Sequence, residues 1–248
     1  MISLEKNELA KIGVQFGNLT RRWNPHMRPY IYGQSNKSKT HILDLQKIIT
    51  SCQELGNYLN SLTEKGETIL FLCTKKSAQE MVKEQAIRCG MPYILNKWKG
   101  GFLTNFREIG KKLKELQGLN SFIQKDGFKN LIKKEQVNCE KRRTKLQNIY
   151  EGVVDLKRPP KALFIIGLNK EKTAFREAKK KGIPVLAVCN SNCNPRLVDY
   201  VLPGNDESVE SINFFASLVA DAIQETKRPK NLTNIDHQEE ERVWTTLT

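Results

Sequence analysis

A cluster of arginine, tryptophan and asparagine side chains near the N-terminus is well suited to bind a ligand. Arg21 and Arg22 are adjacent, Trp23 and Asn24 follow directly, and Arg28 comes soon after. A guanidinium group offers a planar fork of donors that fits a phosphate, an indole ring offers a stacking face, and an amide bonds sugar or phosphate oxygens. These residue types indicate contact with a phosphate-bearing polymer. The alternative is an ordinary loop, in which Trp23 and the following proline pack on a sheet and the arginines are only solvated.

A second segment, at 96–106, combines cations with an aromatic ring and a glycine pair. Two lysines flank a tryptophan, and the glycines allow close backbone approach where a helix starts. Two interpretations of Trp98 and Phe102 remain open and are compatible: they contact the ligand, or they anchor the next segment on the core. The candidate binding residues here are Lys97, Trp98, Lys99, Gly100, Gly101, Thr104 and Asn105.

The sequence lacks the patterns of an enzyme active site. It contains no G-x-G-x-x-G turn, and Gly110 with Lys111 lacks the other residues of a phosphate-binding loop. None of the three histidines stands near a serine, cysteine or aspartate in a recognisable catalytic order. Cys189 and Cys193 offer two thiolates, whereas a structural zinc site needs four ligands. We therefore predict no catalytic residue, no metal site and no cofactor.

The charge of the chain supports a polyanionic partner. The net charge is +14 over 248 residues, and such an excess favours association with a polyanion. Residues 9–43 contain six basic residues and no carboxylate, and residues 97–150 contain 14 basic and five acidic residues. Lys37 and Lys39 lie in the first zone and join its candidate binding residues.

Several classes of protein are excluded. No apolar run approaches the ~18 residues of a membrane span, so we expect no membrane partner. The N-terminus lacks the apolar core of a secretory signal. The six cysteines are scattered at apolar positions and are expected to be reduced thiols.

Strand-sized apolar runs alternate with amphipathic segments, which indicates a parallel sheet in a doubly wound α/β fold. The helix after the first strand is expected to begin at a capping box, Ser77–Glu80, and to bury Met81, Ala86 and Ile87. A long helix is expected after Asp44 and another after Asp206. The expected strands lie at 68–73, 92–95, 162–167, 184–188 and 200–202.

Residues 104–153 interrupt this alternation. We expect helices at 104–116 and 128–150 joined by a turn at 118–127. In the second helix Ile132, Cys139, Leu146 and Val153 recur every seven residues, while Glu135 and Arg142 spoil most of the intermediate core positions. This pattern predicts a protruding coiled-coil hairpin. The expected domains are an α/β sandwich at 1–103 and 154–226, the hairpin at 104–153, and a flexible tail at 227–248.

The chain resembles the ribosomal protein S-two family of the small subunit. The matching blocks occur in the family's order across roughly residues 9–226: Thr20–Pro25 with Met27, Pro29 and Tyr30, Ile42–Leu45, Asn96–Phe106, Pro160–Phe164, Gly182–Val185, Asn192–Pro195 and Pro203–Asp206. The resemblance implies a Rossmann-like α/β domain with a coiled-coil hairpin. It also implies a structural constituent of the small subunit that binds small-subunit rRNA and neighbouring ribosomal proteins, and helps dock an S-one type mRNA-binding protein where one exists. No small-molecule substrate is implied. Arg21, Arg22, Trp23, Asn24, Pro25, Trp98, Gly100, Gly101, Thr104 and Asn105 fall on motif positions.

The chain departs from the family pattern in two places. Gln15 and Asn18 stand where the family often has histidines, so any role of those histidines is absent. Lys99 and Phe102 stand where Leu and Met are common, and Lys99 adds a charge to a usually apolar site.

The alternative to a ribosomal protein is a protein of another functional class, an α/β enzyme acting on RNA or a nucleotide.

The source compartment is expected from the residue composition and the N-terminus. The motif begins at Gly13, which leaves no room for an import presequence, so the gene is expected to be bacterial or organellar. The 29 lysines and 20 asparagines against 12 arginines indicate an AT-rich genome. We therefore expect the plastid (chloroplast) stroma, with the bacterial cytoplasm as the alternative.

Overall fold

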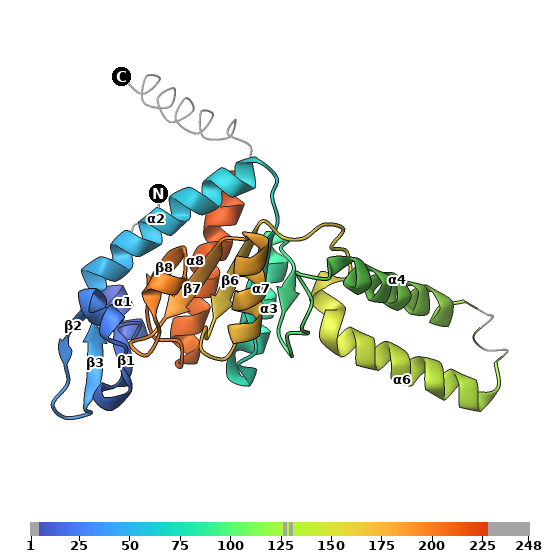
Figure 1. The fold of residues 1–248 in the computed structure, drawn as a ribbon, viewed down its shortest axis with the longest axis horizontal. Helices are drawn as coiled ribbons and strands as arrows, with labels where there is room; N and C mark the ends of the chain where they lie inside the picture. Colours follow the sequence, from blue (N-terminus) through green and yellow to red (C-terminus); the bar gives the residue numbers. More distant parts are fainter. Residues whose placement is uncertain (1–4, 126–127, 129–130, 228–248) are drawn as a thin grey trace, which may run out of the picture.

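A parallel five-stranded sheet forms the centre of the protein. The computed structural model describes residues 5–125, 128 and 131–227. The strands are ordered β5-β4-β6-β7-β8, so the chain starts inside the sheet and then builds outward to both edges (Figure 1). Every residue of β4, β6 and β7 is buried, as expected of apolar runs covered on both faces. The predicted doubly wound, Rossmann-like α/β fold is confirmed. The strands are β4 (Ile69–Cys73), β5 (Tyr93–Ile94), β6 (Ala162–Ile166), β7 (Val185–Cys189) and β8 (Tyr200–Pro203).

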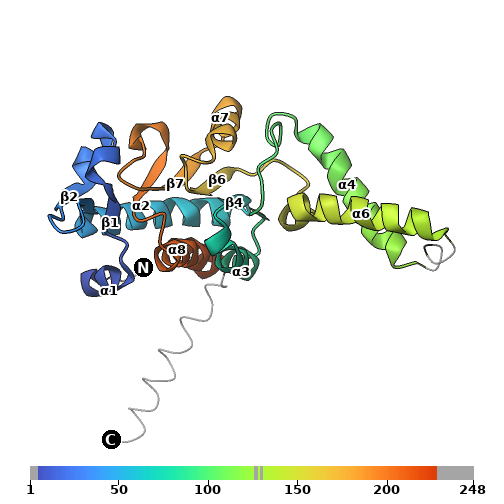
Figure 2. The same cartoon turned by 90° about the horizontal axis from the view of Figure 1, so that it is seen from below.

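Helices cover both faces of this sheet. Helices α3 (Gln79–Cys89) and α8 (Val209–Lys227) lie on one face and α7 (Lys172–Lys181) on the other, while α2 (Leu45–Glu64) packs against α8 and β8 (Figure 2). Asp44 caps α2, accepting a hydrogen bond from the Gln46 backbone N–H at 2.8 Å, which satisfies an otherwise free amide at the helix start.

The start and the buried face of α3 differ from the prediction. The 3₁₀ turn η3 (Lys76–Ala78) precedes the helix, Ala78 is its N-cap and no side chain caps it, so the capping box is wrong. The buried residues are Val82, Ala86 and Cys89. Met81 and Ile87 are exposed because each lies one residue, or about 100°, from that stripe.

The N-terminal segment folds into a second, smaller sheet that was not predicted from the sequence. Its strands pair antiparallel in the order β1-β3-β2. The strands are short and their pairing register is irregular, so the sequence shows no clear alternation of apolar and polar residues along them. The elements are α1 (Lys6–Ile12), β1 (Phe16–Leu19), η1 (Thr20–Arg22), η2 (Pro25–Tyr30), β2 (Ile31–Gln34) and β3 (Thr40–Leu43).

Two helices, α4 (Phe106–Ile123) and α6 (Lys133–Tyr150), project from the sheet as a hairpin arm (Figure 1). The first helix continues through Gly118, so the predicted end at 116 is wrong. A helical glycine costs only about 1 kcal/mol relative to alanine and does not by itself end a helix. The second helix begins at Lys133 rather than at Phe128. Part of the predicted turn, 126–127, and residues 129–130 lie outside the described residues.

The seam of the arm is thin, and its outer end is not a core. Ile132 is 72% exposed, whereas Val153 is buried at the base. Arg142 forms an ion pair with Glu115 of α4, so it joins the two helices rather than only interrupting their contact. Within α6 the one buried residue is Tyr150. The arm therefore depends on its base for packing. The expected tail at 227–248 lies outside the described residues except for Lys227.

Three further expectations concern the cysteines, metal binding and membrane spans. All six cysteines carry free thiols. Within the described ranges, no group of three or more histidine, cysteine, aspartate or glutamate side chains is placed to hold a metal ion. None of the described helices is both long enough and apolar enough to cross a membrane.

Candidate nucleic-acid interface

The arginines of the first candidate segment lie on the surface of the N-terminal sheet. Arg21 and Arg22 form the end of the turn η1, and both are exposed, as is Arg28 in η2. Trp23 packs on His41 of β3, with ring centroids 5.3 Å apart, and is still 38% exposed. The tryptophan therefore anchors this segment and keeps part of its ring accessible to a partner.

Lys37 and Lys39 lie in the loop between β2 and β3, and both are exposed. Lys39 has a positive φ of 51°, a conformation in which non-glycine residues are uncommon. Its carbonyl accepts a hydrogen bond from the backbone N–H of Thr20 at 2.9 Å. The loop is thereby tied to the start of η1. Both lysines and the two arginines therefore belong to one N-terminal unit, which runs from α1 to β3 (residues 6–43).

Polar groups at the carboxyl ends of the parallel strands hold this unit on the large sheet. The Asn18 N–H donates to Oδ1 of Asn190 at 3.0 Å and to Oγ of Ser191 at 2.8 Å. The Asn24 N–H donates to the Ser191 carbonyl at 2.8 Å. Asn190 in turn donates to Asp206 at 3.0 Å. In doubly wound folds ligands bind at this edge, and here the protein's own N-terminal unit packs against the part of the edge beside β7 and β8.

A buried ion pair supports the same junction. Lys75, just beyond β4, contacts Oδ2 of Asp206 at 2.8 Å, and the two side chains are only 12% and 9% exposed. Breaking a buried pair by removing one partner costs about 3–5 kcal/mol because the other charge is left uncompensated. The position of the N-terminal arginines therefore depends on residues near the C-terminal end of the fold.

The second candidate segment is organised around a single carboxylate, Glu177 of α7. Its oxygens accept hydrogen bonds from Nε1 of Trp98 at 3.1 Å and from the backbone N–H groups of Gly101 at 2.8 Å and Leu103 at 2.9 Å. Thr104 donates to it from both its N–H and its hydroxyl, at 3.2 and 3.3 Å. Glu177 thus holds the turn between β5 and α4 in one conformation.

The electrostatics of Glu177 follow from these contacts. Burial by itself raises the pKa of the carboxyl, but the hydrogen bonds from Trp98 and the backbone of the turn outweigh burial, and the pKa is lowered overall. The carboxylate is therefore the charged form at neutral pH, stabilised by several donors.

The structure separates the second segment into positioning and exposed residues. Trp98 is 7% exposed and lies against Phe102, which supports the anchoring role for both. Gly101 has φ of +88°, a conformation that favours glycine, and forms the tight turn. Lys99 is half-buried, as is Thr104. The exposed candidates are Lys97, Gly100 and Asn105.

The two candidate segments do not touch each other. They lie toward opposite ends of the large sheet, on the side covered by α7 (Figure 2). Helix α7 carries exposed cations that were not among the sequence-predicted residues; the available signal was the run of lysines before Gly182. Glu177 was also missed, although it sits beside Ala174 and Ala178 on the buried face of a basic helix. The exposed cations on or beside α7 are Lys170, Lys172, Arg176, Lys179, Lys180 and Lys181, and Lys179 forms an ion pair with Asp199.

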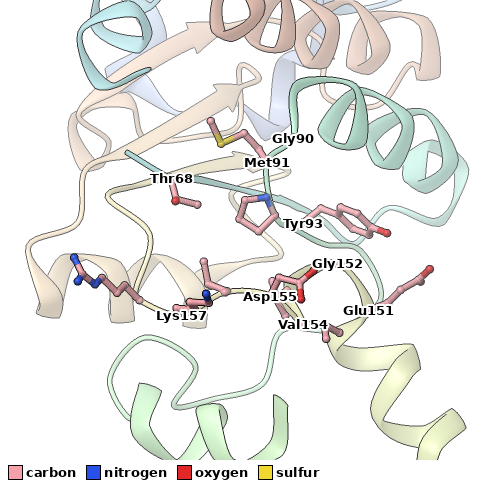
Figure 3. Close-up of a pocket in the computed structure, with 13 residues that line it drawn as sticks. Thr68, Gly90, Met91, Tyr93, Glu151, Gly152, Val154, Asp155 and Lys157 are labelled. Atoms are coloured by element: carbon pink, nitrogen blue, oxygen red, sulfur yellow. The ribbon is translucent and has the colours of Figure 1, made fainter. Parts of the chain in front are cut away.

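A cavity of about 670 Å³ opens at the base of the arm, away from both candidate segments (Figure 3). Tyr93 of the edge strand and Gly152 form part of its wall, and a Cβ on Gly152 would lie 2.3 Å from the Tyr93 ring. This close approach joins the arm to the sheet. The lining mixes acidic and basic groups, including Asp155 and Lys157, and presents no catalytic arrangement.

Comparison with known proteins is consistent across the chain. The family model described as "Ribosomal protein S2" matches residues 9–226. The chain is 41% identical over 225 residues to "Small ribosomal subunit protein uS2" of Acidobacterium capsulatum, covering 91% of this chain and 74% of that protein. It is 42% identical, with the same coverage, to the protein of that name from Koribacter versatilis.

These matches decide between the two functional classes that the sequence left open. Nearly the whole length of this chain matches a component of the ribosome and not an α/β enzyme. Proteins of this kind are structural constituents of the small subunit that bind rRNA and other ribosomal proteins. The chain belongs to the ribosomal protein S2 family.

Proposed function

We propose that the protein contacts small-subunit rRNA through the exposed cations of its N-terminal unit, together with the exposed edge of the turn at 97–105. The observation that carries this proposal is the fixed, exposed position of Arg21, Arg22 and Arg28 in a region, 9–43, that contains no carboxylate. Phosphate contacts of this kind set the register of a protein on RNA. Trp98, Gly101 and Thr104 act indirectly, by holding the turn.

The test is the incorporation of a double variant, Arg21→Ala with Arg22→Ala, into small subunits that lack this protein. We expect weaker incorporation and a salt dependence reduced by roughly one unit of slope for each phosphate that the variant no longer binds. The matched control is Lys47→Ala with Lys65→Ala, which removes the same charge from exposed positions on and after α2. Equal incorporation of both double variants, followed on sucrose gradients, would refute the proposal.

The resemblance also suggests an S-one type mRNA-binding protein as a partner. Docking of such a protein is supported by the family resemblance alone. Small subunits should therefore retain less of that protein when they are assembled without this chain, as measured by mass spectrometry of gradient-purified particles. Full retention would exclude this partner role.

A plastid source is the remaining part of the proposal. The excess of lysine and asparagine over arginine supports an AT-rich genome, while the relatives named above are bacterial. Sequencing the DNA that flanks the gene tests the idea. Neighbouring photosynthesis genes on a plastid chromosome are expected, and a bacterial chromosome would refute it.

A further inference from the structure

Two Asn-Pro turns, 170 residues apart in the sequence, lie face to face in the structure. In η2, Oδ1 of Asn24 accepts a hydrogen bond from the His26 N–H at 3.0 Å. In η5 (Pro195–Leu197), Oδ1 of Asn194 accepts from the Arg196 N–H at 3.1 Å. Each asparagine caps a 3₁₀ turn that starts with proline, and η2 contacts η5.

An open groove of about 410 Å³ lies between the two turns. Its charged lining is entirely basic and comes from both turns: Arg28 from η2 and Arg196 from η5, with His26 beside them. Both guanidinium groups are exposed, and neither has an ion pair with any residue that the structure describes. The rest of the lining is Pro25, Pro29, Tyr30 and Pro195.

The groove is held open by groups beneath it. Met27, between the groove residues of η2, is fully buried. The Asn24 N–H donates to the Ser191 carbonyl at 2.8 Å, and the Cys193 N–H donates to the Asn190 carbonyl at 3.0 Å. The first bond ties η2 to the segment after β7, and the second closes a turn in that segment just before η5. Proline rings fix the backbone at each turn, so the backbone that carries the two arginines is ordered before any partner arrives.

We propose that this groove binds the backbone of a single RNA strand, with one phosphate between Arg28 and Arg196 and a ribose against the proline and tyrosine wall. The inference rests on the proposed rRNA contact and extends it to a residue of the C-terminal half. The charged lining of the groove is entirely basic, and the phosphodiester of RNA supplies the complementary negative charge. An arginine guanidinium group can bind a phosphate through two parallel hydrogen bonds. The volume lies at the low end of the ~300–1,000 Å³ range of ligand pockets, which suits one nucleotide unit and not a duplex.

The test compares Arg196→Gln with Arg158→Gln in binding to small subunits that lack this protein. Arg158 is also exposed and lines the cavity at the base of the arm, so its substitution removes the same charge at a distant site. We expect Arg196→Gln to weaken binding about tenfold and to lower the salt slope by about one, while Arg158→Gln changes binding less than about twofold. Arg196→Lys, which keeps the charge and loses the fork, should fall between wild type and Arg196→Gln.

A double variant asks whether the two arginines share one phosphate. If they do, Arg28→Gln with Arg196→Gln weakens binding by less than the product of the single effects, because either single change already removes part of the same contact. Melting temperatures equal to that of the wild type establish that the variants remain folded.

The remaining outcomes separate this inference from the proposal on which it rests. If Arg21→Ala with Arg22→Ala weakens binding but Arg196→Gln behaves like Arg158→Gln, the groove assignment is overturned and the rRNA contact stands. If Arg196→Gln keeps full rRNA affinity but a neighbouring ribosomal protein is missing from the particle, the groove binds protein and the assignment is again overturned. If neither set of variants changes binding, both proposals fail.

Discussion

At the scale of single residues, Glu177 shows how one side chain positions a segment of the interface. Its carboxylate accepts hydrogen bonds from the indole N–H of Trp98 and from backbone N–H groups of the following turn, in place of water. Buried donors that lose their acceptor cost about 1–3 kcal/mol each. The order of this turn is therefore set by a residue more than 70 positions away in the chain.

We predict that Glu177→Gln lowers the free energy of unfolding by about 2–3 kcal/mol, because the amide is neutral and can orient only one oxygen toward the donors. Urea denaturation measures the change. The control is Glu84→Gln on α3, where the side chain is exposed and the change should stay within about 0.5 kcal/mol. Equal midpoints for the two variants would contradict the role assigned to Glu177.

The same residue makes stability depend on pH. Its pKa is lowered in the folded state, so its contribution is present above the unfolded-state pKa of about 4.3 and is lost as the pH falls through the folded-state value. Asp199 behaves likewise: burial raises its pKa, but bonds from Lys179 and the Val185 N–H lower it overall. We predict that wild type loses stability below about pH 4.3, and that Glu177→Gln loses less over this range. Parallel curves from urea titrations at several pH values would contradict this.

At the scale of elements, the arm and the sheet differ in what holds them. Strands β4 and β6 are buried throughout, whereas α6 buries only Tyr150. The ion pair between Arg142 and Glu115 is largely exposed, and such pairs contribute about 0–1 kcal/mol. The outer arm therefore has little to resist local opening when the protein is free.

We predict that backbone amides of α6 exchange hydrogen rapidly in the free protein, while those of β4 and β6 exchange only on global unfolding. Hydrogen exchange with mass spectrometry makes the comparison. If rRNA or neighbouring proteins cover the arm, α6 becomes protected in assembled subunits. Slow exchange of α6 in the free protein would show that the thin seam is sufficient by itself.

At the scale of the whole molecule, the N-terminal unit and the large sheet act together through the ends of the parallel strands. The buried pair of Lys75 and Asp206 and the bonds of Asn190 and Ser191 connect β1 to the loops after β4, β7 and β8. A doubly wound sheet leaves a crevice at this edge. Here the part of this edge beside β7 and β8 holds the basic N-terminal unit, so the proposed interface is composed of both halves of the chain.

We predict that Asp206→Ala destabilises the protein by about 3–5 kcal/mol, because Lys75 keeps the backbone carbonyl of residue 206 but is left buried without its counter-charge. Trypsin should then cut faster after Arg21 and Arg22, as the N-terminal unit loosens. The matched control is Asp221→Ala, which breaks the exposed pair with Arg88 and should cost about 0–1 kcal/mol. Equal effects of the two substitutions would show that the buried pair does not hold the unit.

The features that depend on local pattern could be predicted from the amino-acid sequence. Continuous apolar runs predicted the buried strands, helical spacing predicted α2 and α8, and the ordered motif blocks indicated the family. Heptad spacing predicted an arm, but the predicted end of its first helix was wrong. A glycine within a helix cannot be told from a glycine that ends one unless the backbone dihedral angle φ is known.

Features made by residues far apart in the chain could not be predicted in this way and are seen in the folded protein. The small antiparallel sheet, the carboxylate of Glu177 beneath the turn at Gly101, and the groove between Arg28 and Arg196 each require two segments to meet. The physical reason is that periodicity reports which face of an element is buried, but not which distant element covers it. That choice is made by packing and by the need of each buried polar group for a partner.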